Sequence, residues 1–214
     1  MPYREGLLVV VSGPAGSGKS TLVERLIMAN PESARRAVTA TTRKPRPGEK
    51  HEEDYYFLTR DEFNEMIEKG EFLEYTEFNG NLYGTPRRSL DKELSKGGVV
   101  ILVIEVDGAE SVKFFFPSAI FVFIIPPTPA ALRHRLEARG TESREEIENR
   151  LCIATHEMQR ISEYDFLIIN DTIETAIHDL AAVIRAVDRS LIFGGELEYW
   201  ELGQFADWNT KHIL

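Results

Sequence analysis

A glycine-rich stretch near the start of the chain holds the residues whose types and spacing best suit a chemical role. It reads GPAGSGKS, follows the apolar run LLVVV and precedes TLVERLIMA, a pattern typical of the start of a helix. Glycines let successive backbone N–H groups turn inward, while Lys19 can reach β and γ phosphates and Ser20 can offer its hydroxyl to Mg²⁺. We therefore expect a cradle for nucleotide phosphates, formed by Gly13, Pro14, Ala15, Gly16, Ser17, Gly18, Lys19, Ser20 and Thr21.

Two carboxylates follow a second apolar run, VVILVIEVD, which ends in Glu105 and Asp107. Side chains two positions apart on a strand point to the same face, so this spacing predicts that both carboxylates share one face. Magnesium bound to nucleotide phosphates takes oxygen ligands, often from the end of a neighbouring strand. We therefore expect Ser20, Glu105 and Asp107 to hold Mg²⁺; the alternative is a solvated pair of carboxylates.

The elements that must position these groups alternate between strands and helices. Four runs are almost continuously apolar, as parallel strands covered on both faces are: GLLVVVSG, GGVVILVIEVD, SAIFVFIIPP and YDFLIIND. Helical spacing of apolar residues predicts helices over about 143–163 and 172–191, the first begun by a capping box of Ser143 and Glu146. This alternation predicts an α/β fold with a central parallel sheet.

Segment 37–97 interrupts the alternation with short β-rich, aromatic stretches around one helical segment, RDEFNEMIEKG. We expect one domain over 1–214, with a core of 5–36, 98–131 and 155–191 and a mixed insertion at 37–97. An arginine-rich helical segment at 132–154 forms a second insertion, and we assign no function to the extension at 192–214.

Composition bounds the possible partners and the compartment. The formal net charge of −10 argues against broad binding to nucleic acid, although arginines gather in TTRKPRPG, TPRRS and LRHRLEARG, where anions could bind; ordinary solvated charges are the alternative. The first residues lack the features of a secretory signal, and no apolar run is long enough to span a membrane. The single cysteine, Cys152, makes no internal disulfide and is expected to be buried. We expect a soluble cytoplasmic protein, and the oligomeric state stays open.

GTPase switches, motor ATPases and small-molecule kinases all share such a phosphate cradle, so other parts of the sequence must distinguish among them. The sequence resembles guanylate kinases over about 7–191, because five blocks follow the order and near-spacing of that family: GPAGSGKST, VTATTRKPRPGEKHEEDYYF, EFLEYTEFNGNLYGTP, LEARGTESREEIENRL and FLIIND. The resemblance implies a P-loop kinase core, a GMP-binding insertion at 37–97 and a helical lid at 132–154. It also implies transfer of the γ-phosphate of ATP to GMP, and to dGMP as well.

The resemblance implies how the acceptor GMP is held. Its phosphate would contact Arg43, Arg46, Tyr55 and Tyr83, and two guanidinium forks with two phenols can indeed neutralise a dianion. Glu74 would accept from guanine N1–H and from the exocyclic amine, whereas adenine would leave that carboxylate unpaired. The remaining positions implied near the base are Thr39, Thr85 and Asp107. The chain departs from the family directly after Asp107, where the usual glutamine is absent.

For catalysis the resemblance implies that arginines of the lid reach the transferring phosphates. The expected catalytic groups are Lys19, Arg43, Arg139 and Arg150, and the further ATP contacts are Arg135 and Asn170. Two alternatives stay open: a related P-loop kinase with another phosphorylated acceptor, and a non-catalytic interaction module of the same fold.

Overall fold

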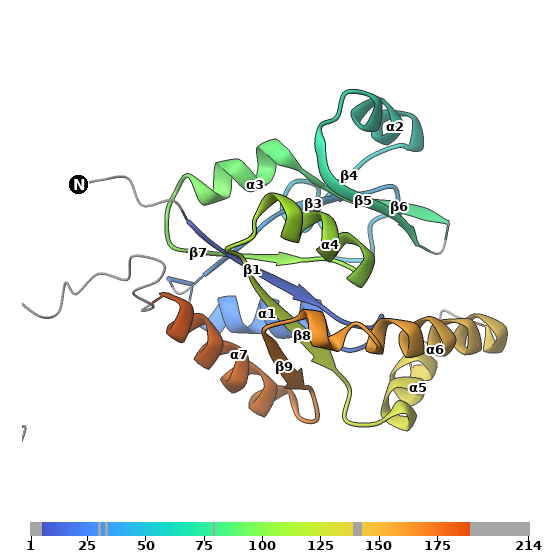
Figure 1. Cartoon of the computed structure of the whole chain (residues 1–214). Coiled ribbons are helices and arrows are strands. Elements are labelled where there is room, and N and C mark those ends of the chain that lie inside the picture. Colours follow the sequence, from blue (N-terminus) through green and yellow to red (C-terminus); the bar gives the residue numbers. More distant parts are fainter. Residues whose placement is uncertain (1–5, 30, 33, 79, 139–142, 189–214) are drawn as a thin grey trace, which may run out of the picture.

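A parallel sheet of five strands forms the centre of the protein. The computed structural model describes residues 6–29, 31–32, 34–78, 80–138 and 143–188. In this sheet the strands run in the order β2, β7, β1, β8, β9, all parallel (Figure 1). Their bounds are β1 Leu7–Ser12, β2 Arg35–Arg36, β7 Val99–Val103, β8 Ile120–Ile125 and β9 Phe166–Ile169.

Alternation along β1 gives the sheet two buried faces. Val9 and Val11 belong to a cluster completed by α1 (Lys19–Ala29) and α7 (Ile173–Asp188). Leu8 and Val10 belong to the opposite cluster, completed by α3 (Arg87–Leu94) and α4 (Val106–Phe115). Figure 1 shows these helix pairs on the two sides of the sheet. The α/β fold with a central parallel sheet, predicted from the sequence, is confirmed.

A second, mixed sheet lies beside the core and carries much of segment 37–97. Its strands run in the order β4, β3, β6, β5, with bounds Tyr55–Phe57, Thr39–Thr41, Asn81–Pro86 and Phe72–Phe78. Helix α2 (Arg60–Glu68) covers it, and the Phe63 ring stacks on Phe72 with centroids 4.3 Å apart. Thr59 and Glu62 begin this helix with a capping box.

The expectation of one helix within 37–97 is wrong, because α3 also forms there. Its sequence, RRSLDKEL, has few apolar residues, and its N-cap Pro86 makes no side-chain cap. Tertiary packing stabilises α3 instead. Leu90 is 1% exposed and belongs to the apolar cluster that contains Leu8 and Val10 of the central sheet. Leu73 of β5 belongs to the same cluster, so the second sheet shares apolar packing with the core.

Two further helices, α5 (Pro129–Ala138) and α6 (Arg144–Met158), pack together through Leu132, Leu136 and Ile147. The capping box of Ser143 and Glu146 is confirmed, but the helix ends at Met158, before a 3-10 turn at Ile161–Glu163. Cys152 is exposed, so the expectation that it is buried is wrong. Within the described residues no helix is long and apolar enough to cross a membrane.

Candidate active site

The glycine-rich stretch forms a loop between β1 and α1, as its pattern predicts. Gly13, Gly16 and Gly18 have φ values of 140°, 93° and 95°, which L side chains rarely adopt. A Cβ at Gly13 would lie 2.1 Å from the Ile124 carbonyl oxygen, so this loop packs directly on the backbone of β8. The backbone thereby holds the loop at the N-terminus of α1, where the helix dipole favours an anion.

Lys19 is buried at the start of α1, and its ammonium is fully engaged. Its Nζ donates to the carbonyl of Gly13, to that of Pro14 at 3.4 Å, and to Glu105 Oε2 at 3.1 Å. Glu105 is thus the carboxylate beside the cradle, placed there as the N-cap of α4. Substrate phosphates would have to draw Lys19 away from these acceptors.

Arg135 and Asn170 meet behind the loop. Asn170 Nδ2 donates to the Ser17 carbonyl at 2.7 Å, and Arg135 donates to the same carbonyl at 3.4 Å and to the Asn170 carbonyl at 2.7 Å. Both side chains therefore brace the cradle in this structure. Their expected contacts with ATP stay a prediction.

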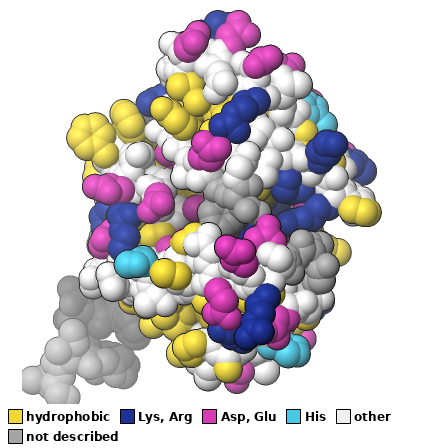
Figure 2. All heavy atoms as spheres, turned by 90° about the vertical axis from the view of Figure 1, so that its right-hand side faces the viewer, with side chains coloured by type: hydrophobic (Ala, Val, Ile, Leu, Met, Phe, Trp, Pro, Cys, Tyr) yellow, Lys and Arg dark blue, Asp and Glu magenta, His cyan; other side chains and the backbone are white. Residues whose placement is uncertain are grey.

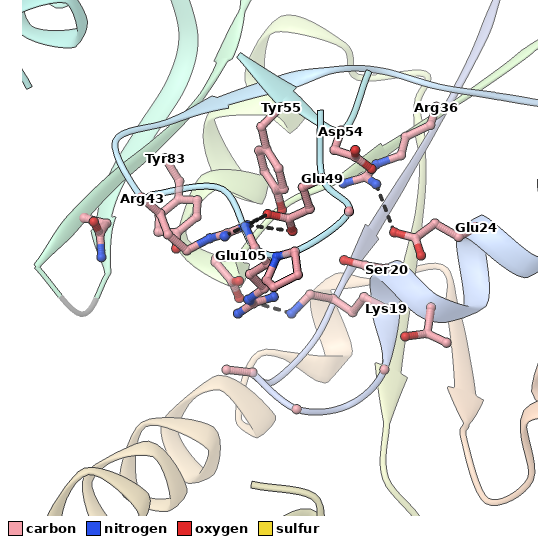
Figure 3. Close-up of a pocket in the computed structure, with 18 of the residues that line it drawn as sticks. Lys19, Ser20, Glu24, Arg36, Arg43, Glu49, Asp54, Tyr55, Tyr83 and Glu105 are labelled. Carbon is pink, nitrogen blue, oxygen red and sulfur yellow. Dashed lines mark hydrogen bonds and ion pairs between the residues drawn. The ribbon is translucent and has the colours of Figure 1, made fainter. Parts of the chain in front are cut away.

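A cavity of about 720 Å³ opens in front of the cradle and reaches the second sheet (Figure 3). It brings together residues from distant parts of the chain: Gly16, Gly18, Lys19, Ser20, Arg43, Arg46, Tyr55, Tyr83, Glu105 and Arg150. On the face shown in Figure 2, Lys and Arg side chains lie among Asp and Glu side chains. The cavity follows that mixed pattern, because Glu24, Glu49, Asp54 and Glu146 also line it.

Arg43 is held by a carboxylate that sequence reasoning missed. Glu49 accepts from both terminal nitrogens of Arg43 at 2.9 Å, and from the Arg46 backbone N–H at 2.6 Å. Burial raises the pKa of Glu49, but these bonds from Arg43 and Arg46 outweigh burial and lower it overall. Glu49 thus holds the Arg43 guanidinium in a bidentate ion pair at the cavity wall.

The turn that delivers Glu49 could have been predicted. Glu49 N donates to the Arg46 carbonyl at 3.0 Å across a turn whose central residues are Pro47 and Gly48, and Gly48 has φ 91°. Pro followed by Gly at these positions is typical of a type II turn. The sequence RPGE therefore indicated that Glu49 folds back toward the arginines.

Two tyrosines line the cavity beside Arg43. The Arg43 guanidinium lies 5.4 Å from the centre of the Tyr55 ring, and Tyr83 faces the cavity from β6. Burial raises the pKa of Tyr83, so its hydroxyl stays a donor at neutral pH. The structure thus brings together the residues expected to bind the acceptor phosphate.

Glu74 lies deeper, in a small cavity that Thr39 also lines. The side chain is 6% exposed, and Thr85 Oγ1 donates to Glu74 Oε1 at 2.6 Å. Burial, with the nearby charge of Glu105, raises the pKa of Glu74 to about 7. A Cβ at Gly108 would lie 2.4 Å from Glu74 Oε2, so the carboxylate packs closely against α4. One carboxylate oxygen is thus fixed by Thr85 at the closed end of the site.

The expectation that Glu105 and Asp107 share a strand face is wrong. Strand β7 ends at Val103, and Asp107 lies in the first turn of α4, where strand alternation no longer applies. Its side chain is 82% exposed and lies 3.7 Å from Arg160. Asp107 is absent from the lining of both cavities, whereas Glu105 lines both.

Ser20 and Glu105 are the oxygen donors beside the cradle that suit Mg²⁺. Among the described residues no group of three or more His, Cys, Asp or Glu side chains could hold a metal by itself. That donor set fits an ion that takes most of its ligands from nucleotide phosphates and water, as Mg²⁺ commonly does.

Helix α6 contributes Arg150 to the cavity wall. Its C-terminal half also carries Glu157, which does not line the cavity but lies close enough to Lys19 and Glu105 to interact with their charges. Burial, with the charges of Glu105 and Asp107, raises the pKa of Glu157 to about 7 despite the opposing effect of Lys19. Sequence reasoning missed this residue. Arg139, and the extension at 192–214, lie outside the described residues.

The sequence is similar to those of known proteins over most of its length. The sequence model of the family described as Guanylate kinase matches residues 5–187. The chain belongs to the guanylate kinase family. The guanylate kinases of Desulfitobacterium hafniense and Thiobacillus denitrificans are each 45% identical to it over 186 residues, which cover 87% of this chain and 92% and 88% of theirs.

The fold is also similar to that of a guanylate kinase of known structure. The crystal structure of the guanylate kinase from Anaplasma phagocytophilum superposes with a TM-score of 0.70 at 33% identity, covering 87% of this chain and 88% of that one. The family expected from the sequence is therefore confirmed, and the alternative of a non-catalytic module is not favoured.

Proposed function

We propose that this guanylate kinase transfers the γ-phosphate of ATP to GMP inside the cavity between the cradle and the second sheet. The observation that carries the proposal is the position of Glu74. It is a buried carboxylate with one oxygen bonded to Thr85, at the closed end of a site that also holds Arg43 and Tyr55. A phosphate and a guanine base can both be accommodated there.

The acceptor phosphate would replace Glu49 as the partner of Arg43. Glu49 already presents two oxygens to the guanidinium fork, which is the geometry that a phosphate would copy. Arg46, Tyr55 and Tyr83 line the same wall and would complete the donor set. The site therefore exchanges one anionic partner for another.

The base would be selected by Glu74. An ionised Glu74 can accept from N1–H and from the exocyclic amine of guanine, whereas adenine offers an acceptor at N1 and no amine beside it. Thr85 is bonded to Glu74, and Thr39 lines the same small cavity, where its hydroxyl would contact the base. An adenine base would leave a buried acceptor unsatisfied.

Catalysis would rest on positioning and charge. A phosphate oxygen of GMP is ionised near neutral pH, so attack on the γ-phosphate requires no general base. Lys19, Arg43 and Arg150 all line the cavity, and would stabilise charge on the equatorial oxygens during transfer. We assign Arg139 the same role, together with a lid at 132–154, on the resemblance to the family.

Ser20 and Glu105 would hold Mg²⁺ together with the donor phosphates. The ion would neutralise charge that develops on the β and γ phosphates. Glu105 becomes available for this role when Lys19 leaves it for the phosphates. We do not assign Asp107 to the metal or to the base, because its side chain points into solvent.

A screen of acceptors tests the proposal. ATP, Mg²⁺ and the purified protein would be combined in turn with GMP, dGMP, AMP, CMP and UMP, with ADP formation as the readout. We expect activity with GMP and dGMP. Activity with another acceptor would favour a related kinase, and binding of a protein partner without formation of GDP would favour an interaction module.

The variant Glu74→Gln isolates the choice of base. An amide presents an NH₂ group where the carboxylate accepts, so kcat/KM for GMP should fall about 100-fold, because hydrogen bonds to charged groups contribute about 1.5–3 kcal/mol each. The dissociation constant for ATP should not change. An unchanged rate with GMP would refute the guanine assignment.

The domain boundaries given above and a cytoplasmic location stay predictions. The exposed thiol of Cys152 suits a reducing compartment, which supports the proposed location.

A further inference from the structure

Arg36 is an arginine of the cavity that has no role in the scheme above. It ends β2 at the edge of the central sheet, and its side chain is only 12% exposed. It lines the same cavity as Lys19 and Arg43. Nothing in its sequence context, ESARRAVTA, distinguishes it from the neighbouring Arg35.

The contacts of Arg36 leave its guanidinium poorly satisfied. Nη1 donates to Glu24 Oε1 at 3.3 Å, and the Glu24 side chain is 50% exposed. Nε is buried and finds no hydrogen-bond partner within the described residues. A guanidinium carries five N–H donors, and a buried donor without a partner is unfavourable. One long bond to a half-exposed carboxylate does not account for a buried arginine.

The position of Arg36 relative to Tyr55 indicates what else it can contact. Its guanidinium lies 5.5 Å from the centre of the Tyr55 ring, and that of Arg43 lies 5.4 Å from the same centre. In the view of Figure 3, Tyr55 stands between the two arginines. Asp54, which also lies beside Arg36 in that view, already accepts from the Lys50 N–H at 2.7 Å. Both guanidinium groups therefore lie beside the Tyr55 side chain, and all three residues line the cavity into which the acceptor phosphate would bind.

We propose that Arg36 is a third arginine for the phosphate of the acceptor nucleotide, held by Glu24 until that phosphate binds. Arg43 and Arg46 come from the insertion, whereas Arg36 comes from the central sheet. The phosphate would then be bound from both parts of the protein at once. This inference rests on the proposed phosphotransfer to GMP.

Steady-state kinetics of Arg36→Gln test the inference. The KM for GMP should rise about 10- to 100-fold, the range expected for loss of a bond to a charged group. The KM for ATP should stay within about twofold, since ATP phosphates bind the backbone cradle. Arg35→Gln is the matched control: Arg35 bonds the carbonyls of Glu93 and Gly97, does not line the cavity, and should leave the KM for GMP unchanged.

A second variant separates a substrate contact from a structural role. Glu24→Gln removes the ion pair but keeps Arg36, so the KM for GMP should stay the same or fall. If Arg36 only joined β2 to α1 through Glu24, both variants would raise the KM for GMP equally, and that result would overturn the proposal.

Binding without catalysis gives an independent readout. GMP alone, without ATP or Mg²⁺, should raise the unfolding temperature of the wild type and of Glu24→Gln, and raise it much less for Arg36→Gln. If Arg36→Gln fails to fold, Arg36→Lys serves instead; it keeps the charge but loses the fork, and should raise the KM for GMP severalfold.

Different results would refute the proposed function and the role of Arg36. A wild type that forms no GDP refutes the proposed function. A wild type that forms GDP, together with an unchanged KM for GMP in Arg36→Gln and Arg36→Lys, refutes only the role of Arg36.

Discussion

The donor and acceptor halves of the cavity recognise phosphate in different ways. The donor half is a backbone loop of consecutive residues, braced from behind by Arg135 and Asn170. The acceptor half consists of side chains from separate strands and turns, and its key arginine is paired with Glu49. The donor half is therefore set mainly by the backbone conformation of one short segment, although distant residues brace it, whereas the acceptor half is assembled from side chains that only the folded chain brings together.

This difference predicts opposite sensitivities to substitution. Apart from Lys19 and Ser20, whose side chains have roles of their own, a backbone cradle should tolerate changes of side chain but no added Cβ at its glycines. A side-chain pocket should respond to single charges and to protonation.

Gly13→Ala should have the largest effect. Its Cβ would lie 2.1 Å from a carbonyl oxygen of β8, at a φ of 140° that alanine rarely adopts. The loop must move, so kcat/KM for ATP should fall more than about 100-fold, as it does when preorganised donors are lost. Isothermal titration with ATP measures the accompanying loss of binding.

Ser17→Ala is the control in the same loop. The Ser17 hydroxyl is buried without a hydrogen-bond partner among the described residues, so ATP binding should change by less than about twofold. If Gly13→Ala bound ATP as well as Ser17→Ala does, the account of a backbone cradle would be wrong.

Protonation of Glu74 should have the next largest effect, a loss of affinity for GMP. Its pKa of about 7 lies above the ordinary value, so the carboxyl carries a proton below that pH and cannot accept both guanine donors. GMP affinity should weaken about tenfold between about pH 8 and about pH 6, in addition to any effect of the phosphate, whose pKa is about 6.

Calorimetric titration with GMP across this pH range, on the wild type and on Glu74→Gln, separates the two groups. The variant keeps only the dependence due to phosphate. Equal pH profiles for the two proteins would show that Glu74 does not titrate during binding. ATP affinity should show no matching step between them.

Gly108→Ala should have the smallest effect on activity. Alanine suits a helix better than glycine, but its Cβ would lie 2.4 Å from Glu74 Oε2 and displace that carboxylate. We expect kcat/KM for GMP to fall about three- to tenfold while stability is kept or increased. Ala109→Gly, at the next position, is the control: it should lower stability without a specific loss of GMP use.

The donor half could be predicted almost entirely from sequence. Its motif specifies the loop, and the helix predicted after it is present and begins at Lys19. A mixed, β-rich insertion at 37–97 was also predicted, but α3 was missed because Leu90, packed against the central sheet, stabilises it and its own sequence pattern does not.

The acceptor half could be predicted only in part. Arg43 and Arg46 were identified through the resemblance, whereas Arg36 and the acids Glu24 and Glu49 were not. Glu24 approaches Arg36 only after folding, while the turn at Pro47 and Gly48 would have indicated the position of Glu49. The error at Asp107 has a local cause: β7 ends two residues before Glu105, which begins a helix. A continuous apolar run does not reveal where a strand stops.

The pairing of three cavity cations with carboxylates has a consequence for selectivity. Lys19, Arg36 and Arg43 are held by Glu105, Glu24 and Glu49. These three positive charges are therefore already balanced by carboxylates, and a ligand that replaces the carboxylates must offset the separation of several ion pairs. Inorganic phosphate, which can displace one carboxylate but fills no base pocket, should bind poorly. A nucleotide that contacts the whole site can replace all of these carboxylates at once. Binding therefore depends on how many carboxylates a ligand replaces and not on its charge alone.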